Sequence, residues 1–177
     1  VFTVLKKESM LHVEDADSDI IFDSERLPLS FEEYAEQKAL ALKSAQDFQA
    51  LYDSAPDKSA VLMPRRETFY GAVPCSAEEM YLHTMNVNNY YFAEIGVSAE
   101  NGPDIFSCRE HAFAALEQQP DFLENRVLMG DYDEEWSLRK LLRRFVWHDR
   151  IHAKAMYRGA VLLFGKENIA DTFYFGD

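Results

Sequence analysis

The feature that most constrains the fold is a long helical segment near the C-terminus. It begins after the acidic cluster Asp131–Glu135 and extends to about Phe164, just before Gly165. Acidic residues suit the positive end of a helix dipole, and glycine is a common helix stop. A helix of about 30 residues is roughly 45 Å long at 1.5 Å per residue. An amphipathic helix of this length indicates a helical bundle, in which other helices cover its apolar face.

A capping box opens the first predicted helix. Ser30 is followed three residues later by Glu33, and in this motif each side chain accepts a hydrogen bond from a free backbone N–H. The helix is expected to end by Ser54, because Pro56 cannot continue it.

The second and third helices are predicted from similar signals. Ser76, with a glutamate three residues on, forms a second capping box, and Gly96 is a natural stop for that helix. The third helix fits residues 104–118, between two prolines. The connections 55–75 and 119–133 are longer than a tight hairpin between antiparallel helices requires, so at least one of them is compatible with a crossover.

Residues 1–29 differ from the rest of the chain. Short β-type pieces, Val1–Leu5 and Ile20–Phe22, alternate with acidic turns, and Pro28 closes the segment. The predicted fold is therefore all-α: a four-helix bundle over residues 30–177, preceded by a short N-terminal extended or β-type arm.

Charge and composition exclude several classes of partner. The formal net charge is -13, so phosphate backbones and anionic lipids repel the chain; neither nucleic acid nor a membrane is expected as a partner. No apolar run approaches the roughly 18 residues of a membrane span, and Val1–Lys7 lacks the order of a signal peptide. Cys75 and Cys108 form no CxxC motif. They favour free thiols in a reducing cytoplasm, with a single disulfide as the alternative.

Two histidines lie one turn apart in the last predicted helix. His148 and His152 are separated by four residues, so both imidazoles leave the same helix face. Burying two neutral imidazoles without partners costs several kcal/mol, which either a metal ion or a hydrogen-bond network would offset. Both belong to an inward seam with steps of 4, 3, 4, 3 and 4, formed by Leu141, Phe145, His148, His152, Ala155 and Gly159.

A third histidine occupies an inward position in the second predicted helix. His83 replaces a hydrophobe in a seam with steps of 3, 4, 3 and 4, formed by Met80, His83, Val87, Tyr90 and Glu94. Imidazole nitrogens bind Zn²⁺ at about 2.0–2.1 Å. The pattern therefore predicts a metal site formed by His83, His148 and His152. His12 lies in the arm and His111 beside the apolar stripe of the third helix.

These motifs resemble the DinB/YfiT-like superfamily of four-helix bundles. The resemblance lies in Met80-Tyr81-Leu82-His83-Thr84, followed about 65 residues later by His148-Asp149-Arg150-Ile151-His152, and covers roughly residues 30–165. It implies an up-down-down-up bundle whose three histidines bind a divalent ion such as Zn²⁺ or Ni²⁺. Members include thiol-S-transferases that use bacillithiol or mycothiol, and a mycothiol-dependent isomerase. Related bundles are often dimers, and a homodimer is compatible with this resemblance.

Three neutral ligands leave one coordination position open, where a thiol could bind as thiolate or a water could acquire a pKa of ~7. The expected function is thus a metal-dependent thiol-S-transferase or related hydrolase, acting on a low-molecular-weight thiol and a small electrophile. A non-catalytic metal-binding stress or accessory protein is the alternative. Small residues beyond the histidines, Ala155 and Gly159, favour an open site and hence the enzyme, whereas the absence of an obvious general base favours the alternative.

The sequence HDRIH also resembles the metalloprotease motif HExxH, with Asp149 in place of glutamate. That class takes its third ligand downstream, where only Glu167 and two aspartates remain, so the protease is less favoured. Asp149 is interpreted instead as a residue beside the metal ligands or as a solvated one.

Three other features have plainer interpretations. Residues 64–70 are compatible with a loop over the mouth of the bundle, and Cys75 is too far from His83 along the chain to be a fourth ligand. The basic residues of the last helix favour a solvated face paired with acidic neighbours, with a docking strip for an anionic thiol or a second subunit as the alternative. They are Arg139, Lys140, Arg143, Arg144, Arg150, Lys154 and Arg158.

Overall fold

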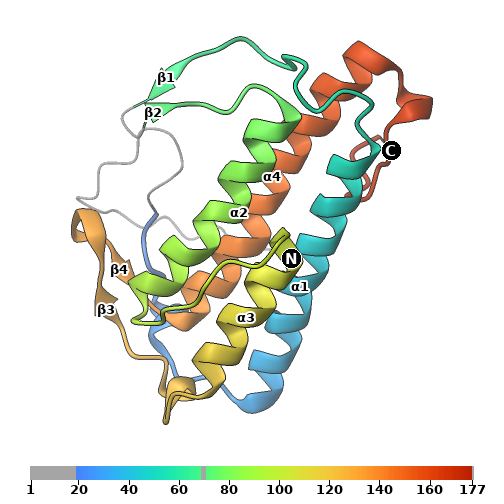
Figure 1. Cartoon of the computed structure of the whole chain (residues 1–177). Coiled ribbons are helices and arrows are strands. Elements are labelled where there is room, and N and C mark those ends of the chain that lie inside the picture. Colours follow the sequence, from blue (N-terminus) through green and yellow to red (C-terminus); the bar gives the residue numbers. More distant parts are fainter. Residues whose placement is uncertain (1–18, 69–70, 177) are drawn as a thin grey trace, which may run out of the picture.

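The structure, a computed structural model, describes residues 19–68 and 71–176. Within these ranges it contains four α-helices and two short antiparallel hairpins (Figure 1). The helices are α1 (Phe31–Ser54), α2 (Ala77–Glu94), α3 (Ile105–Glu117) and α4 (Leu138–Phe164). The hairpins pair β1 (Glu67–Thr68) with β2 (Gly71–Ala72), and β3 (Leu128–Met129) with β4 (Glu135–Trp136). The mostly helical fold agrees with the prediction, whereas neither hairpin was predicted.

Local capping explains where the first two helices begin. The Ser30 hydroxyl accepts the Glu33 N–H, and the Glu33 carboxylate accepts the Ser30 N–H, which completes the predicted capping box. At α2 the prediction was half right. Ser76 accepts the Glu79 N–H as expected, but the Glu79 carboxylate accepts the N–H of Cys75 at 2.8 Å.

Helix α4 begins after the acidic cluster, as predicted. Ser137 caps this helix by accepting the Lys140 N–H, and the acidic residues before it form a 3-10 turn (Asp131–Asp133) and strand β4. Glu134 is buried, and its carboxylate lies 2.5 Å from the Lys140 ammonium. An ion pair with a buried lysine, rather than the helix dipole, accounts for this acidic residue.

The core consists of two apolar clusters placed along the bundle. One contains Phe92, Phe113 and the Leu138–Phe145 part of α4; the other contains Phe48, Met80 and the Ala153–Ala160 part of α4. Helix α1 packs on α3 and α4, and α2 packs on the same two helices. The turn of α4 that carries both histidines therefore lies between the two clusters.

Gly159 has a packing role that the sequence did not reveal. A Cβ at this position would lie 2.6 Å from the Cβ and 2.7 Å from the carbonyl oxygen of Leu62. A β-bridge between Val61 and Ser76 links the two ends of the connection between α1 and α2. The backbone of this connection therefore packs directly against α4 at Gly159. The space beside Gly159 is filled by this connection and is not an opening of the site.

Of the two expectations for Ile20–Phe22, a strand or an extended arm, the structure agrees with the extended arm. The chain there is extended and leads into a 3-10 turn at Asp23–Arg26. Side chains provide the hydrogen bonds that a partner strand would have supplied: the Phe22 N–H, for example, donates to the Glu25 carboxylate at 2.8 Å. The strand predicted at Val1–Leu5 lies outside the described residues.

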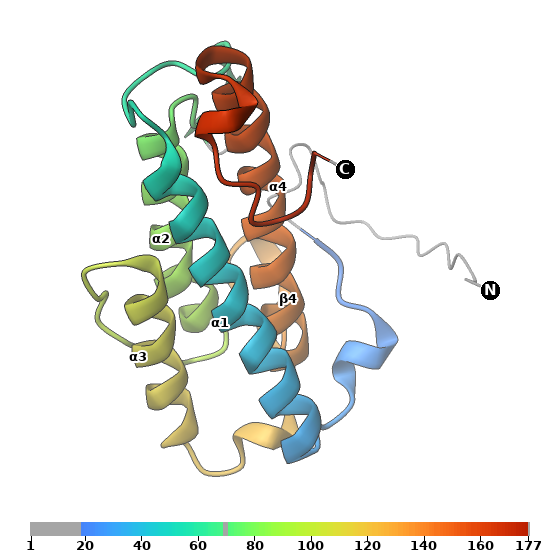
Figure 2. The same ribbon diagram turned by 90° about the vertical axis from the view of Figure 1, so that its right-hand side faces the viewer.

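The two described ends of the chain lie on one side of the bundle. Figure 2 shows the segment that follows Asp19 alongside α4, with the C-terminal segment also folded back beside the helices. The Thr172 hydroxyl donates to the Asp47 carbonyl, and the Ala170 N–H donates to the Ser54 hydroxyl, so the C-terminal segment is fastened to α1. In the described part of the chain, no helix is both long and apolar enough to cross a membrane.

Candidate metal centre

The three predicted histidines converge between α2 and α4. Ligand nitrogens of His83, His148 and His152 all lie within 4.8 Å of one another, and the Nε2 atoms of His83 and His148 are 3.1 Å apart. Two nitrogens bound at 2.0–2.1 Å to one tetrahedral ion are separated by about 3.3–3.4 Å. The His83–His148 pair is thus already near the ligand spacing, and the trio could hold a metal ion.

His152 provides an independent indication of a missing partner. Its Nε2 atom is buried and has no hydrogen-bond partner among the described residues. A buried polar atom without a partner costs about 1–3 kcal/mol, and a divalent ion between the three rings would remove that cost. The ligand set fits Zn²⁺ or Ni²⁺, because imidazole nitrogens suit both ions.

The seam predicted on α4 is confirmed as far as His148, whereas that on α2 is displaced. Leu141, Phe145 and His148 of α4 are buried, but His152 and Ala155 are only half-buried. On α2, however, the fully buried row passes through Thr84 and Asn88, and His83 lies half-buried beside it. The Thr84 hydroxyl donates to the Met80 carbonyl, and the Asn88 amide nitrogen donates to the Cys108 carbonyl, whereas the buried Asn88 amide oxygen has no partner among the described residues. His83 thus occupies the edge of the helix interface, where the site can open outward.

Burial keeps the two imidazoles of α4 neutral. It lowers the pKa of His148 well below its usual value, with smaller contributions from the neighbouring histidines and arginines. Burial, assisted by His83, also lowers the pKa of His152 to about 3. A neutral imidazole offers its lone pair to a metal, so both side chains are in the ligand form near pH 7.

This burial predicts how the stability of the metal-free protein depends on pH. An unfolded histidine titrates near pH 6.5, so below that pH the unfolded chain binds protons that folded His148 and His152 do not. Stability is therefore present above pH 6.5 and is lost as the pH falls below it. In the presence of a chelator, we expect the free energy of unfolding to fall by about 1 kcal/mol between pH 7 and pH 6. Urea titrations at the two pH values measure this difference, and the variant with both histidines replaced by glutamine should lack it.

A cavity of about 250 Å³ opens beside the site. His83 and His152 face it from the helices, and Arg66 and Thr68 border it from the β1–β2 hairpin. The interpretation of residues 64–70 as a loop over the bundle mouth is consistent with this position, although residues 69–70 lie outside the described ranges. The remaining wall is mainly apolar and comprises Met63, Gly71, Ala72, Val73, Pro74, Met80, Ile151 and Ala155.

Asp149 is not solvated. It is fully buried, and its two carboxylate oxygens accept hydrogen bonds from Arg109 of α3 at 2.6 and 3.0 Å. Arg109 also donates to the Ala41 carbonyl and stacks 4.1 Å from the Phe145 ring centroid. This pair, which the sequence analysis missed, joins α1, α3 and α4 immediately next to His148.

The solvated-face interpretation of the basic residues of α4 is wrong for two of them. Lys140 and Arg144 are almost fully buried. Arg150, Lys154 and Arg158 are exposed as expected. Burial lowers the pKa of Lys140, while the adjacent Glu134 opposes that change.

The remaining candidates lie apart from the centre. His111 is exposed, as predicted, and His12 falls outside the described residues. Cys75 and Cys108 are both buried free thiols. In the described ranges the histidine cluster includes neither cysteine nor Glu167, so the downstream third ligand of a HExxH protease has no counterpart there.

Comparison of the chain with protein families, with curated proteins and with solved structures finds no match. The function must therefore be inferred from the histidine cluster and the cavity beside it.

Proposed function

We propose that this chain is a DinB/YfiT-like protein that binds one divalent ion, Zn²⁺ or Ni²⁺, and uses it to transfer a low-molecular-weight thiol to a small electrophile. The observation that carries the proposal is the convergence of three imidazoles around the partnerless Nε2 of His152, next to an open cavity. Hydrolysis of a related electrophile is the closest variant, because it requires the same site.

The proposed up-down-down-up order of the helices has support from the packing. Helix α1 packs on α4, and α2 packs on α3. In Figure 1, the connection 95–104 returns along the bundle between the end of α2 and the start of α3, as a parallel pair requires. The crossover would then be this connection rather than either of the two longer ones.

The residues around the cavity would have different roles in such a reaction. His83, His148 and His152 would hold the ion, which would act as a Lewis acid favouring the ionised form of a thiol or water in its open position. Arg66, at the hairpin edge of the cavity, is placed to attract an anionic group of a substrate. The apolar side chains of Met80 and Ile151 would limit the water around a bound substrate and so strengthen electrostatic interactions there.

The proposal predicts a metal-dependent transfer rate. The metal-loaded protein should accelerate the reaction of a thiol with a chlorinated arene or an epoxide. The rate should rise with pH through an apparent thiol pKa below the ~8.5 of free cysteine. Removing the metal should abolish the rate, and adding it back should restore it. Product formation can be followed with bacillithiol, mycothiol, glutathione and coenzyme A in turn.

The outcomes separate the alternatives. Metal binding without a metal-dependent rate for any of these thiols would favour a non-catalytic stress or accessory protein. Turnover of an ester or amide without thiol would favour the hydrolase. His111→Ala, which removes an exposed histidine outside the cluster, serves as the control and should retain the full rate.

The same proposal includes small molecules as partners. The net charge of -13 disfavours nucleic acid and anionic membranes. A cytoplasmic location is proposed, with support from the two free thiols. The resemblance is also compatible with a homodimer, which sedimentation velocity measurements of the molecular mass would detect.

A further inference from the structure

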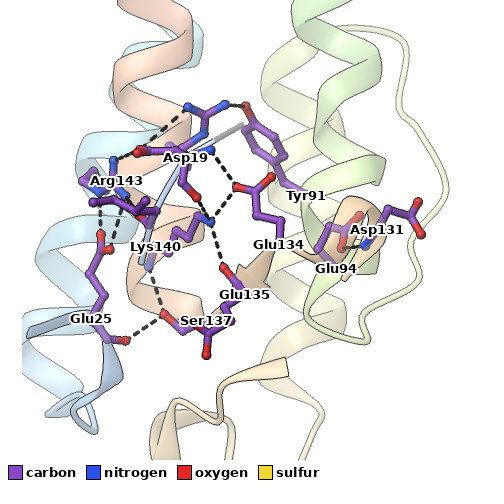
Figure 3. Close-up of polar contacts among 12 residues, drawn as sticks. Asp19, Glu25, Tyr91, Glu94, Asp131, Glu134, Glu135, Ser137, Lys140 and Arg143 are labelled. Atoms are coloured by element: carbon purple, nitrogen blue, oxygen red, sulfur yellow. Dashed lines mark hydrogen bonds and ion pairs between the residues drawn. The ribbon is translucent and has the colours of Figure 1, made fainter. Parts of the chain in front are cut away.

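A partly buried ionic network joins the N-terminal segment to α4 (Figure 3). The Lys140 ammonium donates to the Asp19 carbonyl at 2.6 Å and to the Glu134 carboxylate at 2.5 Å. That carboxylate also accepts the Asp19 N–H at 3.0 Å. Asp19 is thus fixed to α4 by its own backbone.

The Asp19 carboxylate continues the network toward the helix interface. It lies 2.5 Å from one guanidinium nitrogen of Arg143 and 3.9 Å from one of Arg144. Arg144 is buried, and a second nitrogen of its guanidinium donates to the Tyr91 hydroxyl at 3.0 Å. The negative charge of Asp19 therefore compensates a buried guanidinium whose other end holds a tyrosine of α2.

Tyr91 connects this network to the histidine cluster. Its ring is buried and meets the His148 imidazole edge-on, with centroids 5.9 Å apart and planes at 79°. The rings of Trp136 and Phe145 pack on the same tyrosine ring, with centroid separations of 5.0 and 5.4 Å. The hydroxyl is thus held by Arg144 while the ring contacts His148.

We propose that Tyr91 is a positioning residue for the metal centre. The Tyr91 ring packs against the His148 imidazole and limits its rotation. The hydrogen bond from Arg144, whose charge faces Asp19, holds the ring in this position. Metal affinity depends on holding each ligand close to its binding geometry before the ion arrives. The inference rests on the proposed function, because it requires that the three histidines bind an ion.

The test compares two buried tyrosines that each lose one hydroxyl. Tyr91→Phe retains the ring against His148 and removes the bond to Arg144. Tyr34→Phe removes a bond to the Glu117 carboxylate of 2.9 Å, in another buried tyrosine that contacts Phe113 and Phe122. Zn²⁺ affinity is measured by competition with a chromogenic chelator, and Co²⁺ absorption bands report the ligand geometry. Urea unfolding of the metal-free proteins gives the stability of each variant.

We expect Tyr91→Phe to raise the Kd for Zn²⁺ by at least about threefold and to shift or broaden the Co²⁺ bands. Tyr34→Phe should leave both unchanged even if it lowers the urea midpoint as much. Equal metal binding by Tyr91→Phe and the wild type, or equal weakening in both variants, would overturn the inference. A wild-type protein that binds no ion would instead overturn the proposed function itself.

A second variant tests the network while leaving Tyr91 intact. Asp19→Asn removes the charge that faces Arg143 and Arg144, and it should weaken Zn²⁺ binding in the same direction. Asp47→Asn, which affects an ion pair with Lys43 on α1, is its control and should bind Zn²⁺ like the wild type. If Tyr91→Phe fails to fold, wild-type affinity in Asp19→Asn would overturn the inference.

Discussion

Asp149→Ala is expected to lower the free energy of unfolding by about 3–5 kcal/mol, the usual cost of removing one partner of a buried ion pair. The substitution leaves the Arg109 guanidinium fully buried opposite an apolar side chain. That guanidinium donates to both carboxylate oxygens of Asp149; without them it retains, of the contacts described above, its hydrogen bond to the Ala41 carbonyl and its stacking on Phe145. The cost arises from the uncompensated charge rather than from the lost volume.

Urea unfolding in the presence of a chelator measures this effect without a contribution from bound metal. Asp47→Ala is the matched control, because the Asp47 carboxylate forms a solvent-exposed ion pair with Lys43; its removal should cost at most about 1 kcal/mol. Replacing both Arg109 and Asp149 by Met and Leu should recover much of the loss, since a well-packed apolar pair can match a buried ion pair. A change of less than 1 kcal/mol in Asp149→Ala would contradict the assigned role.

The four helices were predictable because the signals that start and stop them are local. Ser30, Ser76 and Asp104 each cap a helix through the residue three positions on. Gly96 and Gly165 adopt the positive φ angles that end α2 and α4. A cap acts within one turn of the chain, so its effect is visible in the sequence.

The two hairpins could not be predicted from the same kind of signal. Each pairs only two residues per strand, which is too short for an alternating pattern. Their positions depend on tertiary partners: the buried Asn125 amide, for example, ties the β3–β4 region to the carbonyls of Glu25 and Leu27. Such contacts join residues about a hundred positions apart, so no local pattern predicts them.

The histidine site was predictable, and the ionic network beside it was partly so. His148 and His152 replace hydrophobes in a helical seam, which indicates their burial directly. Lys140 and Arg144 continue the same interval of four residues toward the start of α4, a stripe that places both beside the histidines. The sequence contains that signal, but two of the partners, Asp19 and Tyr91, come from distant segments, and only the folded chain brings them together.

His148→Ala is expected to weaken metal binding by at least 10-fold while leaving the helical content largely intact. Two imidazoles hold a divalent ion far less tightly than three. His148 is the most buried of the three ligands, and its Nε2 lies 3.1 Å from that of His83. A water molecule that replaced it would be held less firmly in the same place. The lost ring also leaves a cavity between the two apolar clusters, so some loss of stability should accompany the loss of metal.

The measurement is a Zn²⁺ titration against a competing chelator, with circular dichroism as the check on folding. His111→Ala is the matched control, because this exposed histidine of α3 lies outside the cluster and its removal should change neither quantity. Equal loss of metal from both variants would show that the ligands were wrongly chosen. Retention of full affinity by His148→Ala would place the metal elsewhere, and the proposed thiol chemistry would then lose the site on which it depends.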